Sequence, residues 1–192
     1  MLARRAWRSI GPMTMSFDDF RHLCEQRRSI RYFDKGPLTA EEILSVLDVA
    51  NMAPSVENIQ PWKFHVVMSG DVLTKLRDAP CYGNFIEGAA AFVIVTCDQT
   101  ARPGTGETLW HPRELEYSCV AAMENIVLGA TARGLASCWV SLHQGVVHEV
   151  LRLPPTESVI GGILLGHWKR GEEKAVEGHR SSSVREHVVF HE

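Results

Sequence analysis

The segment that decides how this chain is interpreted is Ala53-Pro54-Ser55-Val56-Glu57-Asn58-Ile59-Gln60-Pro61-Trp62. Its two prolines restrict the backbone, and Ser55, Asn58 and Gln60 offer neutral hydrogen-bonding groups. A stiff polar turn of this kind suits the recognition of a planar heterocycle that carries both donors and acceptors. Serine and asparagine in turns also commonly bond to their own backbone. Taken alone, the segment is explained most simply as such a turn.

A basic cluster, Arg27-Arg28-Ser29-Ile30-Arg31, precedes that turn by about two dozen residues. Three guanidinium groups and a hydroxyl within five residues suit a phosphate or a carboxylate, because the arginine fork matches both anions. The cluster also follows a predicted helix, and cations at a helix C-terminus are stabilised by the helix dipole. Taken alone, the second explanation is again the simpler one.

The patterning of apolar residues predicts helices and buried strands in mixed order. Ser16 is placed as the N-cap of a helix that ends near Arg28. Thr39 and Glu42 form a capping-box pattern, and Pro54 ends the helix that follows them. Further along, the sequence predicts a strand over 62–68, a short helix over 71–78, a buried strand over 90–97, a loop over 100–111, a long helix over about 112–133 with Gly134 as its C-cap, a strand over 137–141, a helix over 145–151 and a buried strand over 158–166. This order is not a regular βαβ alternation, so it predicts an α+β fold with helices packed on a sheet.

The long predicted helix is apolar on more than one side. Val120, Met123, Val127 and Ala130 form a helical stripe, which the segment 121–126 widens with further apolar residues. A helix of this kind is central in the fold or lies at a dimer interface.

Composition excludes several classes of function. The formal net charge is −3, which gives no indication of nucleic-acid binding. No apolar run reaches the roughly 18 residues that a membrane span needs. The five cysteines follow no disulfide or metal-binding pattern, which fits a reducing compartment such as the cytoplasm. His143 and His148 lack a third ligand at a suitable spacing, so no metal site is expected.

The first residues are treated separately from the domain. The segment 1–14 is basic at its start and lacks the apolar core of a secretory signal. The segment is consistent with a short targeting arm, a disordered tail or an over-long start site, with Met13 and Met15 as alternative starts. We expect it to be a disordered extension outside the fold. The folded domain is expected to occupy residues 15–192.

The basic cluster and the proline-flanked turn together resemble the nitroreductase family, whose signature is an R-R-S-x-R helix end followed by A-P-S-x-x-N-x-Q-P-W before a strand. Both motifs occur here in that order and at that separation. The similarity continues in Tyr82-Gly83-Asn84-Phe85, in Gly134-Leu135-Ala136-Ser137-Cys138-Trp139 and in Leu164-Leu165-Gly166-His167. It covers about residue 16 to the end of the chain. The chain contains no G-x-G-x-x-G motif and no Walker motif, so the sequence does not indicate another nucleotide-binding fold.

The resemblance implies a homodimeric α+β fold with a central, mostly antiparallel sheet flanked by helices and FMN at the subunit interface. Arg27, Arg28, Ser29 and Arg31 of one subunit would contact FMN, with Arg27 at the phosphate and ribityl end and Arg31 nearer the pyrimidine edge. The remaining contacts would come from Pro54, Ser55 and Asn58 of the partner, from Asn84, from Cys138, Trp139 and Val140 on the other side of the flavin, and from a late arginine, Arg180 in preference to Arg185. Members of this family often wrap the C-terminal tail over the partner.

The activity implied is that of an oxidoreductase. It would pass electrons from NADPH or NADH through FMN to a nitroaromatic, quinone or similar small acceptor, with ping-pong kinetics because one open site takes both substrates in turn. The chemistry would occur at flavin N5, and no side chain is assigned as a catalytic acid or base. The stretch between Cys97 and the long helix is short and contains no large lid insertion. This argues against more specialised activities, such as iodotyrosine deiodination or flavin fragmentation.

Two other hypotheses fit the same residues. The short lid and the lack of an acid or base are also consistent with a non-catalytic flavin-binding protein for storage or sensing. Alternatively, the arginines only cap a helix and the chain is a dimeric interaction module without flavin. Turnover separates the first of these from an enzyme, and flavin binding separates the second.

Overall fold

A computed structural model describes residues 15–68, 70–82, 88–102, 111, 113–169 and 183–191. The predicted extension, residues 1–14, lies outside these residues. The α-helices are α1 (Phe17–Gln26), α2 (Ala40–Asn51), α3 (Asp71–Lys75), α4 (Glu114–Ala132) and α5 (Gln144–Leu151). The strands are β1 (Phe33–Asp34), β2 (Trp62–Val67), β3 (Ala91–Asp98), β4 (Ala136–Val140) and β5 (Glu157–Trp168), and short 3₁₀ turns are η1 (Val56–Asn58), η2 (Leu76–Asp78) and η4 (Val184–Glu186).

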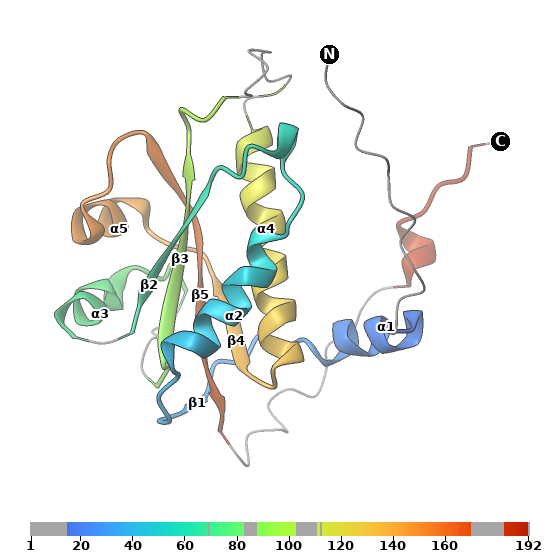
Figure 1. Cartoon of the computed structure of the whole chain (residues 1–192), viewed down its shortest axis with the longest axis horizontal. Coiled ribbons are helices and arrows are strands. Elements are labelled where there is room, and N and C mark those ends of the chain that lie inside the picture. Colours follow the sequence, from blue (N-terminus) through green and yellow to red (C-terminus); the bar gives the residue numbers. More distant parts are fainter. Residues whose placement is uncertain are drawn as a thin grey trace.

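The strands form one antiparallel sheet. Its order is β1-β5-β3-β2, and β4 also pairs with β5. Each described pairing of strands is antiparallel, which agrees with the predicted sheet. The predicted α+β fold is therefore confirmed, with helices on both faces of the sheet (Figure 1).

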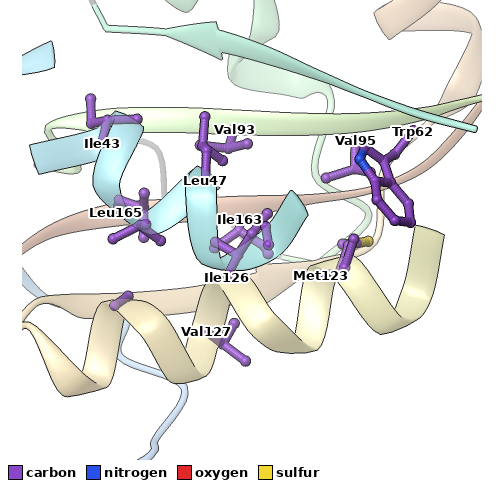
Figure 2. Packing of buried hydrophobic residues seen from close by; sticks show 14 of the residues in the cluster. Ile43, Leu47, Trp62, Val93, Val95, Met123, Ile126, Val127, Ile163 and Leu165 are labelled. Atoms are coloured by element: carbon purple, nitrogen blue, oxygen red, sulfur yellow. The ribbon is translucent and has the colours of Figure 1, made fainter. Parts of the chain in front are cut away.

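Strand β3 lies in the middle of the core, as its uninterrupted apolar run predicts. Val93 and Val95 belong to a hydrophobic cluster with residues of α2 and α4. Phe92 and Ile94 point to the other face and join a second cluster that includes residues of η2 and α5. Alternate side chains of the strand thus fill both layers, which is why a polar face is absent from this run. Figure 2 shows the first of these clusters between α2, α4 and the sheet.

Three of the predicted helix boundaries have the expected chemistry. The Glu42 backbone N–H donates to Thr39 Oγ1 (3.1 Å), and the Thr39 N–H donates to the Glu42 carboxylate (2.8 Å), which completes the predicted capping box. Ser16 caps α1 in the same way. After α4, Gly134 has φ 71°, and its N–H donates to Thr131 O (2.9 Å). A left-handed glycine at this position ends the helix as predicted.

On two helices, apolar side chains are less buried than their helical periodicity predicts. In α4, Met123, Val127 and Ala130 are buried, but Val120 is 42% exposed. In α1, no residue is buried, and Phe17 is 78% exposed. Amphipathic helices whose apolar side chains stay exposed point to a missing partner surface. Within the described residues, no helix combines the length and apolar character needed to cross a bilayer.

A buried carboxylate ties three strands together on the face of the sheet opposite α4. Glu157 in β5 is 4% exposed and pairs with Lys63 of β2. Thr96 of β3 donates its hydroxyl to Glu157 Oε2 (2.9 Å), and His65 Nε2 lies 3.1 Å from the same hydroxyl oxygen. Burial alone raises the pKa of Glu157, but the bonds from Lys63 and Thr96 lower it below its usual value of 4.5. The carboxylate therefore stays ionised in the folded state.

We expect Glu157→Gln to lower the free energy of unfolding at pH 7 by about 2 kcal/mol, because a hydrogen-bonded buried charge is lost. Because the folded pKa is depressed, the stabilisation by Glu157 is present above pH 4.5 and is lost as the pH falls through the folded pKa. Urea unfolding of both proteins at pH 7 and pH 3.5 measures this. The difference in the free energy of unfolding between the wild type and Glu157→Gln should be smaller at pH 3.5 than at pH 7. An equal difference at both pH values would contradict this prediction.

Candidate functional site

The basic cluster lies where α1 ends and the chain turns toward the sheet. Arg28 donates to the backbone carbonyl of Glu25 and, at 2.8 Å, to that of Arg27. These are carbonyls of the last turn and C-cap of α1, so Arg28 acts as the helix-capping cation that one of the two explanations predicts. Arg31 is exposed, and its Nη1 lies 3.3 Å from Ser29 O. Arg27 is half-buried and Ser29 is exposed.

The cluster is joined to β4 by a backbone hydrogen bond. The Ile30 N–H donates to Ser137 O (2.8 Å), and the Ile30 side chain is buried. Burial raises the pKa of the Cys138 thiol, and the Arg31 guanidinium offsets part of this rise. Two segments that are more than a hundred residues apart in sequence thus lie side by side.

The three β4 residues assigned to the flavin differ in orientation. Cys138 and Val140 are 1% and 6% exposed and pack in the cluster that faces α5, so only their backbone atoms are available to a ligand. Trp139 points to the opposite face and is 37% exposed. Its Nε1 lies only 3.1 Å from where a Cβ on Gly161 would stand. The same Cβ would stand 2.9 Å from Met123 Cε, so a side chain at Gly161 would require both Met123 and Trp139 to shift.

The turn between α2 and β2 has an unusual backbone. Glu57, Asn58 and Gln60 have φ values of 46°, 55° and 52°, in the left-handed region that favours glycine. The Gln60 N–H donates to Ser55 Oγ (3.1 Å), and the Asn58 N–H donates to Ser55 O (3.1 Å). Ser55 thus satisfies its own turn, as the simpler explanation predicts. Pro54 and Asn58 are exposed. Among the described residues, none forms a hydrogen bond with the side-chain amide of Asn58.

The turn and the basic cluster lie at opposite ends of α4. The Val56 N–H donates to the hydroxyl oxygen of Ser118, in the first turns of α4 (3.1 Å). Ser137, which binds the basic cluster, follows the C-terminal end of the same helix. From Ser118 to Ala132, the last residue of α4, the helix rises about 21 Å. Figure 1 shows the two regions separated by most of the length of α4, so one small ligand does not reach both within one chain.

Two of the remaining predicted contacts, Asn84 and Arg180, lie outside the described residues. The alternative late arginine, Arg185, is exposed in η4. Among the described residues, no group of three His, Cys, Asp or Glu side chains is arranged to hold a metal ion.

A family model described as "Nitroreductase family" matches residues 24–117 and 79–167. The chain belongs to the nitroreductase family. It is 31% identical to an Archaeoglobus fulgidus protein assigned as an NADH dehydrogenase/NAD(P)H nitroreductase, over 74% of this chain and 82% of that protein. It is 32% identical to the 5,6-dimethylbenzimidazole synthase of Rhodospirillum rubrum, over 87% of this chain and 90% of the synthase.

The fold is shared with solved nitroreductases. A nitroreductase-type protein of Desulfovibrio desulfuricans, crystallised in complex with FMN, superimposes with a TM-score of 0.76 at 22% identity, covering 90% of this chain and 96% of that protein. At this identity, the likeness shows the fold. The relatives of this nitroreductase-family chain carry different activities in their names, so the acceptor does not follow from family membership.

Three residues that the sequence alone does not reveal shape this candidate site. Gly161 leaves room for Trp139, and Asn51 and Ser118 hold the turn from outside it. None belongs to the recognised motifs. Their partners lie between 11 and 62 positions away in sequence, and periodicity carries no information about such pairs.

Proposed function

We propose that this chain is an FMN-dependent oxidoreductase that works as a homodimer and passes electrons from NADPH or NADH to a nitroaromatic, quinone or similar small acceptor. The observation that carries the proposal is the separation of the two motif segments by most of the length of α4. A second copy with its α4 antiparallel to the first would bring the basic cluster of one chain to the turn of the other. The binding site then needs two chains.

Exposed apolar side chains support such a dimer. They lie on α1, on α2 and the residue after it, on α4 and in the C-terminal tail: Phe17, Phe20, Leu44, Val49, Met52, Tyr117, Val120, Val188, Val189 and Phe190. Clusters of exposed apolar residues mark interaction surfaces. Two-fold homodimers are the commonest soluble assembly, and their interfaces use the same patch twice.

The chemistry of the exposed groups fits a phosphorylated aromatic cofactor. Arg27 would hold the phosphate, because a guanidinium fork matches its oxygens. Ser55 and the free Asn58 amide would bond to polar atoms of the ring system. Trp139 offers a partly exposed aromatic surface beside the basic cluster. We propose that Arg28 and Ser29 also contact FMN, although the Arg28 side chain already caps α1.

FMN supplies the redox chemistry by accepting hydride at N5 and returning electrons to an acceptor. The protein would bind and orient it and adjust its electrostatics. Arg31, placed toward the pyrimidine edge, would stabilise negative charge that develops there on reduction. No described side chain is assigned proton transfer. One open face would serve the nicotinamide donor and the acceptor in turn, which gives ping-pong kinetics.

The comparisons support the cofactor and the donor. A protein of the same fold was crystallised in complex with FMN, and the name of the Archaeoglobus fulgidus relative includes NAD(P)H nitroreductase. The synthase relative shows that family members diverge in reaction. The acceptor is therefore the part of the proposal that measurement must identify. We also propose a reducing compartment, the cytoplasm, for this protein.

The purified chain should be yellow or should gain flavin absorbance when FMN is added. Under anaerobic conditions, NADPH or NADH should bleach that absorbance, and a nitroaromatic or quinone should restore it. A steady-state acceptor screen with both donors should give parallel double-reciprocal lines. A colourless protein that gains no flavin would overturn the proposal. Bound FMN that neither nicotinamide reduces would favour a storage or sensing role instead.

A further inference from the structure

The turn that carries Pro54, Ser55 and Asn58 is held in a disfavoured conformation. Three of its residues other than glycine, Glu57, Asn58 and Gln60, have positive φ values. Residues in this backbone region persist only where surrounding contacts fix them, and such sites concentrate where ligands bind. The bonds that Ser55 makes to Asn58 and Gln60 lie within the turn and do not attach it to the body of the protein.

Asn51, the last residue of α2, attaches the exit of the turn to the core. Its side-chain carbonyl accepts a hydrogen bond from Trp62 Nε1 (3.0 Å). Its backbone carbonyl accepts a longer bond from Gln60 Nε2 (3.5 Å). Trp62 is itself fixed, since it is 8% exposed and packs in the cluster with Met123 and Val95 (Figure 2). Through Asn51, the position of Gln60 is thus fixed relative to the buried indole ring of Trp62.

Ser118 attaches the entrance of the turn to α4. The side chain is buried, and its hydroxyl donates to Glu114 O (2.8 Å) while it accepts from the Val56 N–H (3.1 Å). A hydroxyl is needed for both roles, because it is donor and acceptor at once. Asn51 and Ser118 thus fix the two ends of the turn against two different helices.

We propose that Asn51 and Ser118 are positioning residues for the cofactor: they hold the turn in its left-handed form, so that Ser55 and the Asn58 amide are preorganised for FMN. This inference rests on the proposed function. Neither residue needs to touch the ligand. Without these bonds, the turn populates other conformations, and FMN binding has to restore the productive one at the expense of affinity.

The test uses the full chain. It compares two variants that each remove one hydrogen bond to the turn or its exit with two matched control variants that do not. Asn51→Leu keeps the side-chain size but removes the acceptor for Trp62, whereas Asn51→Asp keeps an acceptor oxygen. Ser118→Ala removes the link to Val56. Ser45→Ala is its control, because the Ser45 hydroxyl also bonds to a helix carbonyl, Glu42 O, away from the turn.

Two measurements decide the outcome. Amide hydrogen exchange without FMN should become faster over residues 56–60 in Asn51→Leu and Ser118→Ala, and not elsewhere. The Kd for FMN should rise about tenfold in each, which corresponds to one lost hydrogen bond. Asn51→Asp and Ser45→Ala should stay within about twofold of the wild type, a difference close to RT.

Each contrary result has a distinct meaning. An unchanged FMN Kd in Asn51→Leu overturns the inference while the proposed function stands. An equal loss in Asn51→Asp also overturns it, because the acceptor oxygen would then be irrelevant. Faster exchange throughout the chain, rather than over 56–60, assigns both residues a general structural role. A wild-type chain that binds no FMN overturns the proposed function itself, which the wild-type titration shows before any variant is made.

Discussion

Arg27→Ala should raise the Kd for FMN by roughly 10- to 100-fold, whereas Asn58→Ala should raise it by less than tenfold. The reason is the difference in charge. A hydrogen bond to an ionised partner contributes about 1.5–3 kcal/mol, and one between neutral groups about 0.5–1.5 kcal/mol. Arg27 is half-buried at the end of α1, where its charge is less screened than that of an exposed side chain. Flavin fluorescence titration of the apoprotein measures both constants.

The controls separate a specific contact from the loss of a positive charge. Arg77→Ala removes an exposed arginine from η2, which lies on the α5 side of the sheet, and should leave the Kd unchanged. Arg27→Lys keeps the charge but loses the two-pronged geometry, so its Kd should lie between those of the wild type and Arg27→Ala. The effect of Arg27 should also diminish at high salt. If Asn58→Ala weakens binding more than Arg27→Ala, the phosphate assignment is wrong.

The elements of the fold were largely predictable because their signals are local. The capping boxes, Gly134 and the apolar run of β3 each act within a few residues, and the corresponding elements are present in the structure. The segment 71–78 is divided into α3 and η2 rather than forming one helix. Strand β1 has only two residues, too few for any periodicity, and was not predicted. Its pairing with β5 joins residues more than 130 positions apart.

The candidate site was predictable only as a set of segments. The motifs supply the candidate residues, but they do not indicate which of the side chains are accessible. Cys138 and Trp139 are neighbours in one motif, yet strand alternation buries the first and exposes the second. Val120 follows the buried helical pattern of α4 and is nevertheless exposed, because periodicity does not distinguish the core from a partner surface. Asn51 and Ser118 depend on contacts that only the folded chain creates.

Val120→Asp should convert the proposed dimer to a monomer and abolish FMN binding at micromolar protein. Val120 is 42% exposed in one chain and lies one turn from Tyr117 on α4, so the monomer can fold with a charge there. In an apolar helix–helix interface, an unpaired carboxylate costs several kcal/mol, and two-fold symmetry places it there twice. Because the two proposed half-sites of each chain are separated by about 21 Å along α4, from Ser118 to Ala132, separated chains should not bind FMN.

Val72→Asp is the matched control for Val120→Asp. Val72 has nearly the same exposure, 40%, but lies in α3, on the other face of the sheet from α4. Sedimentation equilibrium and FMN titration of both variants, with far-UV circular dichroism to verify folding, decide the outcome. The control should remain dimeric and yellow. A folded Val120→Asp monomer that still binds FMN as tightly as the wild type would show that one chain suffices, and the antiparallel α4 arrangement would be wrong. A variant that stays dimeric with bound FMN would place the interface elsewhere.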